Sequence, residues 1–172
     1  METSKAEQAY TLLRRDILDA RLAPASALPV SLLRERYGLG WTPLREALSR
    51  LETERLVTFA PNRGYRVAGV SAAELLDLQK ARRAVETSLL EDSIDSGDIE
   101  WEQRLVAAHH ALRQAAPLRM MMPEAELAAW HRRHRAFHRA LLSGAGSVWL
   151  QRIAEQVNDH LDRHHRAMVL AQ

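Results

Sequence analysis

Residues 38–48 read Gly38-Leu39-Gly40-Trp41-Thr42-Pro43-Leu44-Arg45-Glu46-Ala47-Leu48. The glycine that opens this run predicts the end of a short helix over residues 31–37, with Ser31 as its N-cap. Thr42 is a favoured N-cap residue and Pro43 a favoured first helical residue, so another helix is predicted from there to about residue 55. Two short helices joined by a glycine turn are typical of a helix-turn-helix.

Two β-rich runs follow this helix pair. Residues 56–60 and 65–67 are rich in β-branched and aromatic side chains, and Asn62-Arg63-Gly64 between them is typical of a tight turn. An amphipathic helix over residues 7–20 precedes the pair. This order predicts a winged helix-turn-helix over residues 1–70, a module that presents a helix end to a groove of double-stranded DNA.

The helix that begins near Thr42 has two chemically different faces. Its apolar face predicts a buried contact with the two earlier helices, and Arg45, Ser49 and Glu52 fall on the opposite face. Free backbone N–H groups at its amino end favour phosphate, and side chains there can enter the major groove. Arg63 is predicted at the tip of the wing, where arginine suits the phosphates or the minor groove. The predicted DNA-binding residues are Ser31, Trp41, Thr42, Pro43, Arg45, Ser49, Asn62, Arg63 and Gly64.

Two alternatives stay open at this point. A plain helical bundle would pair Arg45 with a nearby acid such as Glu46 or Glu52, although such a bundle needs no wing. Trp41 could contact a sugar or a thymine methyl group, or it could pack under the wing.

The composition excludes several classes of protein. The 172 residues include no cysteine, which excludes disulfides, a Cys-ligated zinc and a thiol nucleophile. No apolar run approaches the roughly 20 residues of a membrane span, and the N-terminus has no apolar signal region, so we expect a cytoplasmic protein without a membrane partner. Residues 1–70 hold 11 Lys/Arg against 8 Asp/Glu, and residues 71–172 hold 13 against 14. The basic excess therefore lies in the predicted DNA-binding part.

Only helices are predicted after residue 70. Ser71 and Glu74 have the spacing of a capping box and open a helix to about residue 96. Further helices are predicted over residues 99–116, over residues 124–142 and from residue 147 onward, with the methionines at residues 120–122 in a connector. The predicted fold class is mainly α, with an N-terminal winged helix-turn-helix (residues 1–70) followed by an all-α helical bundle (residues 71–172).

The first part resembles the DNA-binding domain of the GntR family of bacterial repressors. The resemblance covers residues 10–70 and rests on residues 39–48 together with Leu51-Glu52, Leu56-Val57 and residues 62–67. Thr42, Arg45 and Gly64 match positions that contact DNA in family members. Trp41 stands where the family has a base-contacting Arg, and Ser31 or a neighbour stands where many members have another Arg. The resemblance therefore implies an operator that differs from the usual one.

The second part resembles the start of the FCD-type effector domain of the FadR subgroup, with a pattern similar to repressors of carbon-starvation and γ-aminobutyrate catabolism genes. The matching residues lie in 76–77, 81–86, 130–138, 141 and 144–147. The resemblance implies a homodimer that binds a small carboxylate effector, often through a divalent metal. Arg82 matches an arginine that faces the effector pocket; the alternative is an intrahelical pair with Glu86.

Two histidines are the candidate metal ligands in this half. His134 and His138 are four residues apart on one helix face, a spacing that can chelate Zn, Ni or Mn, and both belong to the predicted effector site. His138 matches a family ligand, and His134 replaces a family Asp. The family takes further His ligands from later helices, so a chain ending at Gln172 predicts an incomplete FCD-type bundle, in which His160 and His164 could compensate. The alternative is that the pair is only a half-exposed polar face.

A DNA-binding transcriptional regulator, in particular a repressor released by a small acid, is the function that these patterns favour. A metal-dependent enzyme would need further ligands, and the sequence contains no HExxH, nucleophile elbow or phosphate loop. A third hypothesis is a metal-binding helical protein or a truncated remnant that binds DNA without responding to an effector.

Overall fold

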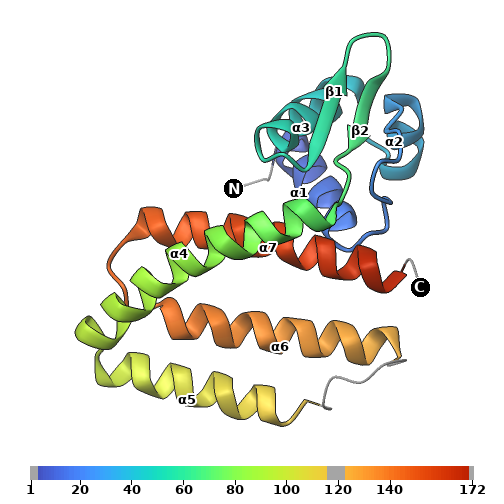
Figure 1. Ribbon diagram of the computed structural model, residues 1–172. Helices are drawn as coiled ribbons and strands as arrows, with labels where there is room; N and C mark the ends of the chain where they lie inside the picture. The colour runs from blue at the N-terminus through green and yellow to red at the C-terminus, as the bar shows by residue number, and fades with distance from the viewer. Residues whose placement is uncertain (1–3, 116–122, 171–172) are drawn as a thin grey trace. The chain divides into compact units, whose positions relative to one another are not determined.

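The computed structural model describes residues 4–115 and 123–170, and the connector predicted at residues 120–122 lies outside them. The mainly α fold with a two-stranded wing is confirmed (Figure 1). Contacts divide the chain into two compact units, Met1–Lys80 with Gln156–Gln172 and Ala81–Glu155. The elements are α1 (Lys5–Leu18), α2 (Val30–Tyr37), α3 (Trp41–Thr53), β1 (Val57–Ala60), β2 (Gly64–Val67), α4 (Ala72–Ser96), α5 (Ile99–Arg113), α6 (Glu124–Leu142) and α7 (Val148–Leu170).

The core of the first unit lies between α1, α2 and α3. Each helix turns an apolar face inward, and Leu13, Leu44 and Leu48 are fully buried there. Ser4 begins α1 because its hydroxyl accepts the Glu7 N–H at 3.1 Å, which satisfies one of the free donors of the first turn. The helices therefore form a compact support for the wing.

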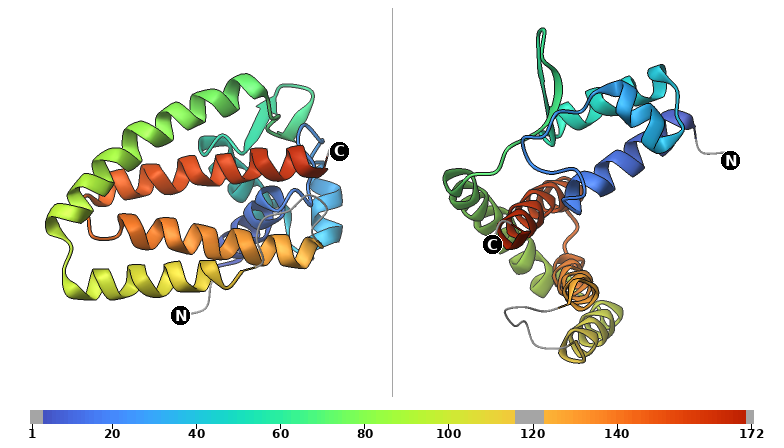
Figure 2. Two further views of the ribbon diagram at one scale, coloured as in Figure 1. Left: turned by 60° about the horizontal axis from the view of Figure 1, so that its bottom comes forward. Right: turned by 90° about the vertical axis from the view of Figure 1, so that its right-hand side faces the viewer.

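The wing is an antiparallel hairpin that projects from the helices (Figure 2). Val57 pairs with Val67 and Ala60 with Gly64, and both valines are buried at the base of the hairpin. Phe59 and Tyr65 contact each other further out, with ring centroids 4.9 Å apart and ring planes tilted by 51°. Buried valines at the base and a polar tip fix the register, because a slip by one residue would turn the valines outward.

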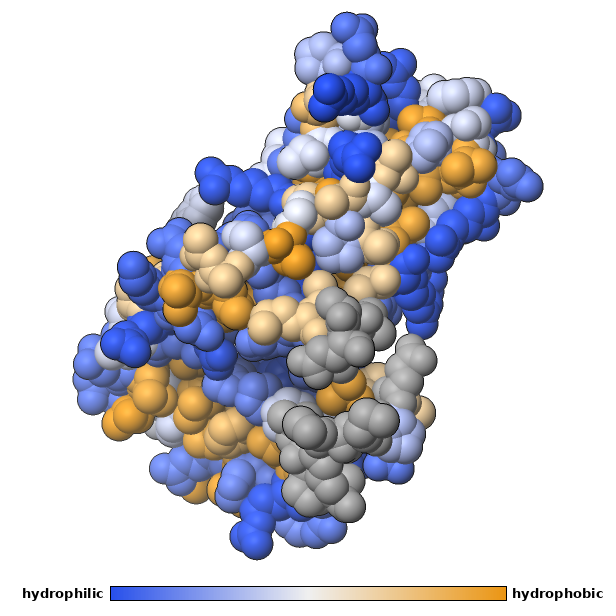
Figure 3. All heavy atoms as spheres, turned by 45° about the vertical axis from the view of Figure 1, so that its right-hand side comes forward, coloured by the Kyte–Doolittle hydropathy of each residue, from blue (hydrophilic) through white to orange (hydrophobic). Residues whose placement is uncertain are grey.

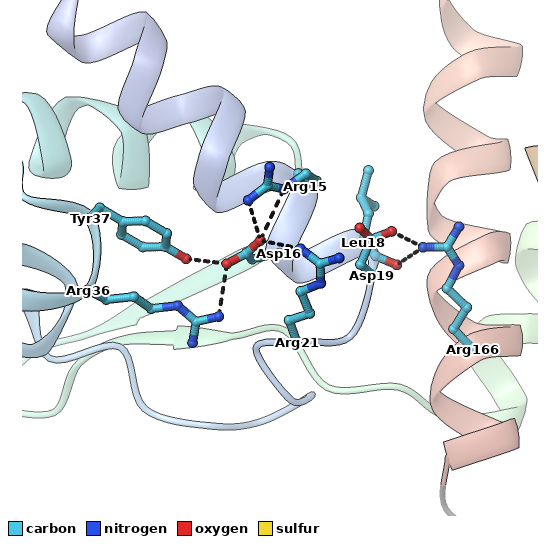
Figure 4. A network of polar contacts seen from close by, with 8 residues as sticks. All are labelled: Arg15, Asp16, Leu18, Asp19, Arg21, Arg36, Tyr37 and Arg166. Carbon is cyan, nitrogen blue, oxygen red and sulfur yellow. Dashed lines mark hydrogen bonds and ion pairs between the residues drawn. The ribbon is translucent and has the colours of Figure 1, made fainter. Parts of the chain in front are cut away.

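The carboxyl half of α7 packs within the first unit against the winged head, by which we mean α1, α2 and α3 together with the hairpin of β1 and β2. Arg163 is fully buried and donates to the carbonyls of Ala68 at 2.6 Å and Gly69 at 3.1 Å, in the segment that follows β2. Arg166 pairs with Asp19 and donates to the carbonyl of Leu18 at 3.1 Å, at the end of α1 (Figure 4). Residues of α7 therefore complete the first unit.

The second unit contains α5 and α6 side by side (Figure 2). Asp98 begins α5 because its carboxylate accepts the Trp101 N–H at 2.7 Å. The indole N–H of Trp101 donates to the Ala140 carbonyl at 3.0 Å and so connects α5 to α6. Leu89 and Leu142 lie in the small apolar core of this unit.

The length and polarity of each helix decide whether it could span a membrane. Across residues 4–115 and 123–170, each helix is too short or too polar to cross a bilayer.

Candidate nucleic-acid interface

The amino end of α3 projects into solvent. Gly40 is its N-cap in extended conformation, and Trp41 and Thr42 are exposed directly after it. The helix therefore begins earlier than the sequence predicts: Thr42 is not the N-cap and Pro43 is not the first residue. Gly40 has no side chain with which to cap, so the first N–H groups of α3 have no side-chain acceptor from it.

The two faces of α3 divide as predicted. Leu44, Ala47, Leu48 and Leu51 are fully buried, whereas Arg45, Ser49 and Glu52 are exposed. Among the residues that the structure describes, Arg45 makes no ion pair, so the alternative pairing with Glu46 or Glu52 is not found. The guanidinium of Arg45 is therefore available to an external anion or base.

Trp41 is exposed, not packed under the wing. Its side chain is 49% exposed, and the guanidinium carbon of Arg34 lies 5.2 Å from its ring centroid. That distance is within the range of a cation–π contact. Arg34 was not among the residues predicted from the sequence; its place in the last turn of α2, facing the start of α3, is the feature that could have drawn attention to it.

The wing tip is a β-turn over residues 60–63. The Arg63 N–H donates to the Ala60 carbonyl at 3.0 Å, with Pro61 and Asn62 in the central positions. Asn62 has a φ of 63°, as the third residue of a type II turn requires, and asparagine tolerates this conformation. Gly64 follows with a φ of 70° and begins β2. The turn therefore lies slightly earlier than Asn62-Arg63-Gly64.

Polar side chains cover the tip of the wing (Figure 3). Arg63 is exposed there and makes no ion pair with any described residue. Arg66 lies in β2 and instead donates to the Ala25 carbonyl, in the connector between α1 and α2. Arg63 is therefore the wing cation that faces outward without a partner, and Arg66 anchors the base.

Ser31 does not cap α2. The helix begins at Val30 after Pro29, without a side-chain hydrogen bond at the N-cap, and Ser31 is an exposed residue of the first turn. Gly38 ends α2 as predicted, in the left-handed conformation at a φ of 66°. The hydroxyl of Ser31 thus faces solvent.

The arginines of the winged head fall into two groups. Those beside α1 are ion-paired: Arg14 with Glu54, Arg36 with Asp16, and Arg50 with Glu7. Arg34 and Arg45, like Arg63, make no ion pair with any residue of the described part of the chain. Arg55, just beyond the carboxyl end of α3, is likewise exposed without an ion pair to a described residue. The amino end of α3 and the wing tip therefore carry part of the uncompensated charge of this module, where a phosphate backbone would neutralise it.

The second unit gathers a polar cluster on α4 and α6. The Arg82 guanidinium donates to Glu86 at 2.9 Å and lies 3.0 Å from Nδ1 of His138. The His138 and His134 ring centroids are 4.6 Å apart, and His134 stacks on Trp130 at the same distance. The intrahelical pair of Arg82 with Glu86, one of the two alternatives, is therefore formed, and Arg82 also joins the histidines.

Comparison with known proteins identifies both halves. Residues 5–67 match the family model described as bacterial regulatory proteins, gntR family, and residues 77–171 match the FCD domain. The HTH-type transcriptional repressor GlaR of Escherichia coli K12 is 41% identical over 155 residues, which are 90% of this chain and 70% of that protein. The chain belongs to the GntR family. It is a DNA-binding transcriptional regulator with an FCD domain.

Further relatives agree with this assignment. The HTH-type transcriptional regulator BphR of Paraburkholderia xenovorans LB400 is 35% identical over 163 residues, 95% of this chain and 66% of that protein. Among solved structures, a GntR regulator from Rhodococcus sp. RHA1 has a TM-score of 0.75 at 23% identity, covering 96% of this chain and 76% of its own. Escherichia coli McbR/YncC has a TM-score of 0.71 at 20% identity, covering 98% and 74%. These two structures support the fold.

Membership in this family decides between the function classes. GntR regulators bind DNA, and their FCD domain points to a small-molecule effector. The family comprises transcriptional regulators, so the metal-dependent enzyme is not retained as a hypothesis.

The histidines of this GntR-family chain differ in their surroundings. His160 and His164 are buried in the first unit, where His160 Nε2 lies 2.8 Å from the Glu54 carbonyl and His164 Nε2 lies 3.1 Å from Glu74. Both therefore belong to the contact between α7 and the rest of the first unit. Within the described residues no group of three or more His, Cys, Asp or Glu side chains could hold a metal. His134 and His138 therefore form a pair next to the Arg82 cation, and not a full coordination set.

Proposed function

We propose that this GntR regulator is a repressor that binds a palindromic operator as a homodimer and leaves it when a small carboxylate binds the FCD domain. The observation that carries the proposal is the joint exposure of Thr42 and Arg45 at the amino end of α3, with Arg63 on the wing. A helix-turn-helix presents base-reading side chains from this end, and two such heads on a dimer read two half-sites. The name of the relative GlaR supports repression.

Arg45 and Arg63, which make no ion pair with any described residue, would have separate roles. Arg45 is the fifth residue of α3 and projects from its second turn. Its guanidinium is suited to a bidentate contact with a guanine edge. Arg63 at the wing tip is suited to phosphate or a narrow minor groove, because its cationic side chain is exposed there and makes no ion pair with a described residue. Ser49 and Asn62 would supply additional hydrogen bonds to the backbone.

The polar cluster of the second unit would receive the effector. The Arg82 guanidinium already holds a carboxylate, that of Glu86, and a ligand carboxylate could take this position through a bidentate pair. His138 and His134 lie beside it and would add hydrogen bonds, with Trp130 supplying an apolar wall. A ligand that binds one arrangement of the dimer more tightly than the other shifts the dimer toward the first. Operator affinity would then change by no more than the ratio of the ligand's affinities for the two arrangements.

Recovery of bound fragments from a genomic library by the purified protein tests DNA recognition. We expect a palindromic site, bound with an affinity that falls steeply as salt rises. Arg45→Ala should weaken this specific binding by about 1–3 kcal/mol and relax the preference at one base pair of each half-site. Arg63→Ala should weaken binding to all duplexes alike and reduce the salt slope by about one. A protein that retards no fragment at low salt contradicts the proposal.

A second experiment tests the effector. A panel of small mono- and dicarboxylates is screened for those that raise the unfolding temperature and release the recovered operator. Arg82→Gln should abolish both effects, and Arg83→Gln, an exposed neighbour on α4, should leave both intact. If every carboxylate leaves operator binding unchanged, the chain is the effector-blind DNA-binding protein of the third hypothesis.

Metal binding at His134 and His138 stays a prediction. Two imidazoles four residues apart on α6 can chelate Zn²⁺, Ni²⁺ or Mn²⁺ weakly, and a ligand carboxylate could add the missing donors. Calorimetric titration of each ion, with and without the carboxylate, tests this on the wild type and on His138→Ala. Heat that is equal in both proteins, or absent in both, contradicts the metal prediction without affecting the DNA-binding proposal.

A further inference from the structure

Trp41 and Arg34 form a cation–π pair across the turn between α2 and α3. Trp41 is the first residue of α3 and keeps 49% of its side chain exposed, although it is the largest apolar side chain at this end of the helix. The guanidinium carbon of Arg34 lies 5.2 Å from the ring centroid, so one side of the indole is covered by a cation. The remaining indole surface faces solvent at the end of α3 that enters the groove.

The backbone between the two residues is held in place. The Gly38 N–H donates to the Arg34 carbonyl at 2.9 Å and closes α2, in a left-handed conformation that glycine adopts without strain. Leu39 is buried in the core immediately after this glycine. The turn therefore fixes the distance between the last turn of α2 and the first residue of α3, and the indole needs little further ordering when DNA binds.

We propose that Trp41 reads the 5-methyl group of a thymine in the major groove, while Arg34 holds the indole in place and contacts the DNA backbone. This inference rests on the proposed operator binding and adds a base preference to it. Thymine is the base that presents a methyl group in the major groove, and apolar side chains recognise it there. The guanidinium of Arg34 lies over one side of the ring and has several N–H donors, so it can cover the ring and donate to phosphate together.

The chemistry of the indole opposes a guanine contact at Trp41. An indole has a single N–H donor and no acceptor, so it cannot make the bidentate pair with O6 and N7 of guanine that an arginine makes. Its exposed surface is otherwise apolar and gains free energy when it contacts another apolar group. The positive charge at this place is supplied by Arg34, which makes no ion pair within residues 4–115 and 123–170.

Replacement of single thymines by deoxyuridine tests the inference on the wild-type protein. Deoxyuridine keeps the base pair and lacks only the methyl group. For the operator recovered above, we expect one thymine per half-site at which the replacement lowers affinity about fourfold, since burial of one such carbon contributes about 0.8 kcal/mol. Replacement at other thymines should change affinity by less than about twofold. If no thymine shows the effect, the inference is wrong while operator binding stands.

Variants assign the effect to the two residues. Trp41→Ala should bind thymine and deoxyuridine operators equally. Arg34→Lys keeps the charge but not the planar guanidinium, so it should keep the salt slope and reduce the methyl preference. Arg34→Met should reduce both the salt slope and the methyl preference. The control is Arg63→Met on the wing, which should lower the salt slope and leave the methyl preference unchanged. A methyl preference that survives Trp41→Ala overturns the inference, and absence of any specific operator overturns the proposed function with it.

Discussion

The carboxylate of Asp16 accepts a hydrogen bond from the Tyr37 hydroxyl at 2.8 Å, which ties the end of α1 to the end of α2 (Figure 4). Asp16 is 3% exposed, and Arg36 and Arg15 also donate to it. Tyr37 is the last residue of α2, directly before the Gly38 turn. One buried carboxylate therefore positions the helix that precedes the DNA-reading helix.

The pKa of Asp16 predicts an acid-sensitive winged head. Burial raises this pKa, but hydrogen bonds from Tyr37 and Arg15 outweigh burial and hold it below its usual value. A lowered carboxyl pKa contributes stability above about pH 4 that is lost as pH falls toward the folded-state pKa. We expect Asp16→Asn to lower the free energy of unfolding at pH 7 by about 1–3 kcal/mol, and to remove part of the loss below pH 4. Urea unfolding at pH 3–7 measures both; parallel curves for the two proteins would contradict the prediction.

Arg163 predicts a stabilising contact between α7 and the segment after β2. Its guanidinium is fully buried and hydrogen-bonds two carbonyls, and burial lowers its pKa. Arg163→Ala should destabilise the first unit by about 2–4 kcal/mol, because it leaves a cavity and removes the donor of two acceptors. Arg152→Ala, an exposed site on the same helix, should change stability by less than about 0.5 kcal/mol. Chemical unfolding of both variants checks this, and equal effects would show that Arg163 carries no special stabilisation.

We expect the buried His160 to make the free energy of unfolding depend on pH in a second range, closer to neutrality. Burial lowers the pKa of His160, partly offset by its hydrogen bond to the Glu54 carbonyl, and Arg163 lowers the pKa further while Glu74 raises it. The unfolded chain binds a proton near pH 6.5 that the folded protein takes up only at lower pH, so stability falls as pH drops below about 6.5. His160→Gln should flatten the unfolding free energy between pH 5 and 7. The exposed His165→Gln should retain the wild-type slope, and a slope unchanged in His160→Gln would assign the dependence elsewhere.

The backbone at Gly97 in the second unit has no room for a larger side chain. A Cβ at Gly97 would lie 2.5 Å from the Ser93 carbonyl oxygen and 2.7 Å from Cδ2 of Trp101. Gly97→Ala should therefore cost about 1–3 kcal/mol through overpacking at the start of α5. Gly146→Ala is the matched control, since no heavy atom lies within 4 Å of a Cβ there. Thermal unfolding compares the pair; a Gly97→Ala variant as stable as the control would refute the clash.

Local patterns in the sequence were enough to predict the helices, the wing and the apolar face of α3. Periodic leucines, the glycine after α2 and the Asn62 turn act within a few residues, and such effects are independent of the rest of the chain. The N-cap predictions at Ser31 and Thr42 were each wrong by two residues, because Pro29 and Gly40 occupy the N-cap positions without a capping side chain. Helix starts are sensitive to such local competition.

The partners of the charged residues were decided by the tertiary structure. Arg14 pairs with Asp159 and Arg166 with Asp19, across roughly 145 residues of sequence, while the Arg34 guanidinium lies over the Trp41 ring across one turn. An arginine looks the same in sequence whether it meets a carboxylate or solvent, because ion pairing depends on distance in space and on burial. Which arginines make no ion pair, and that His160 and His164 contact Glu54 and Glu74, follow only when the folded chain brings these distant segments together.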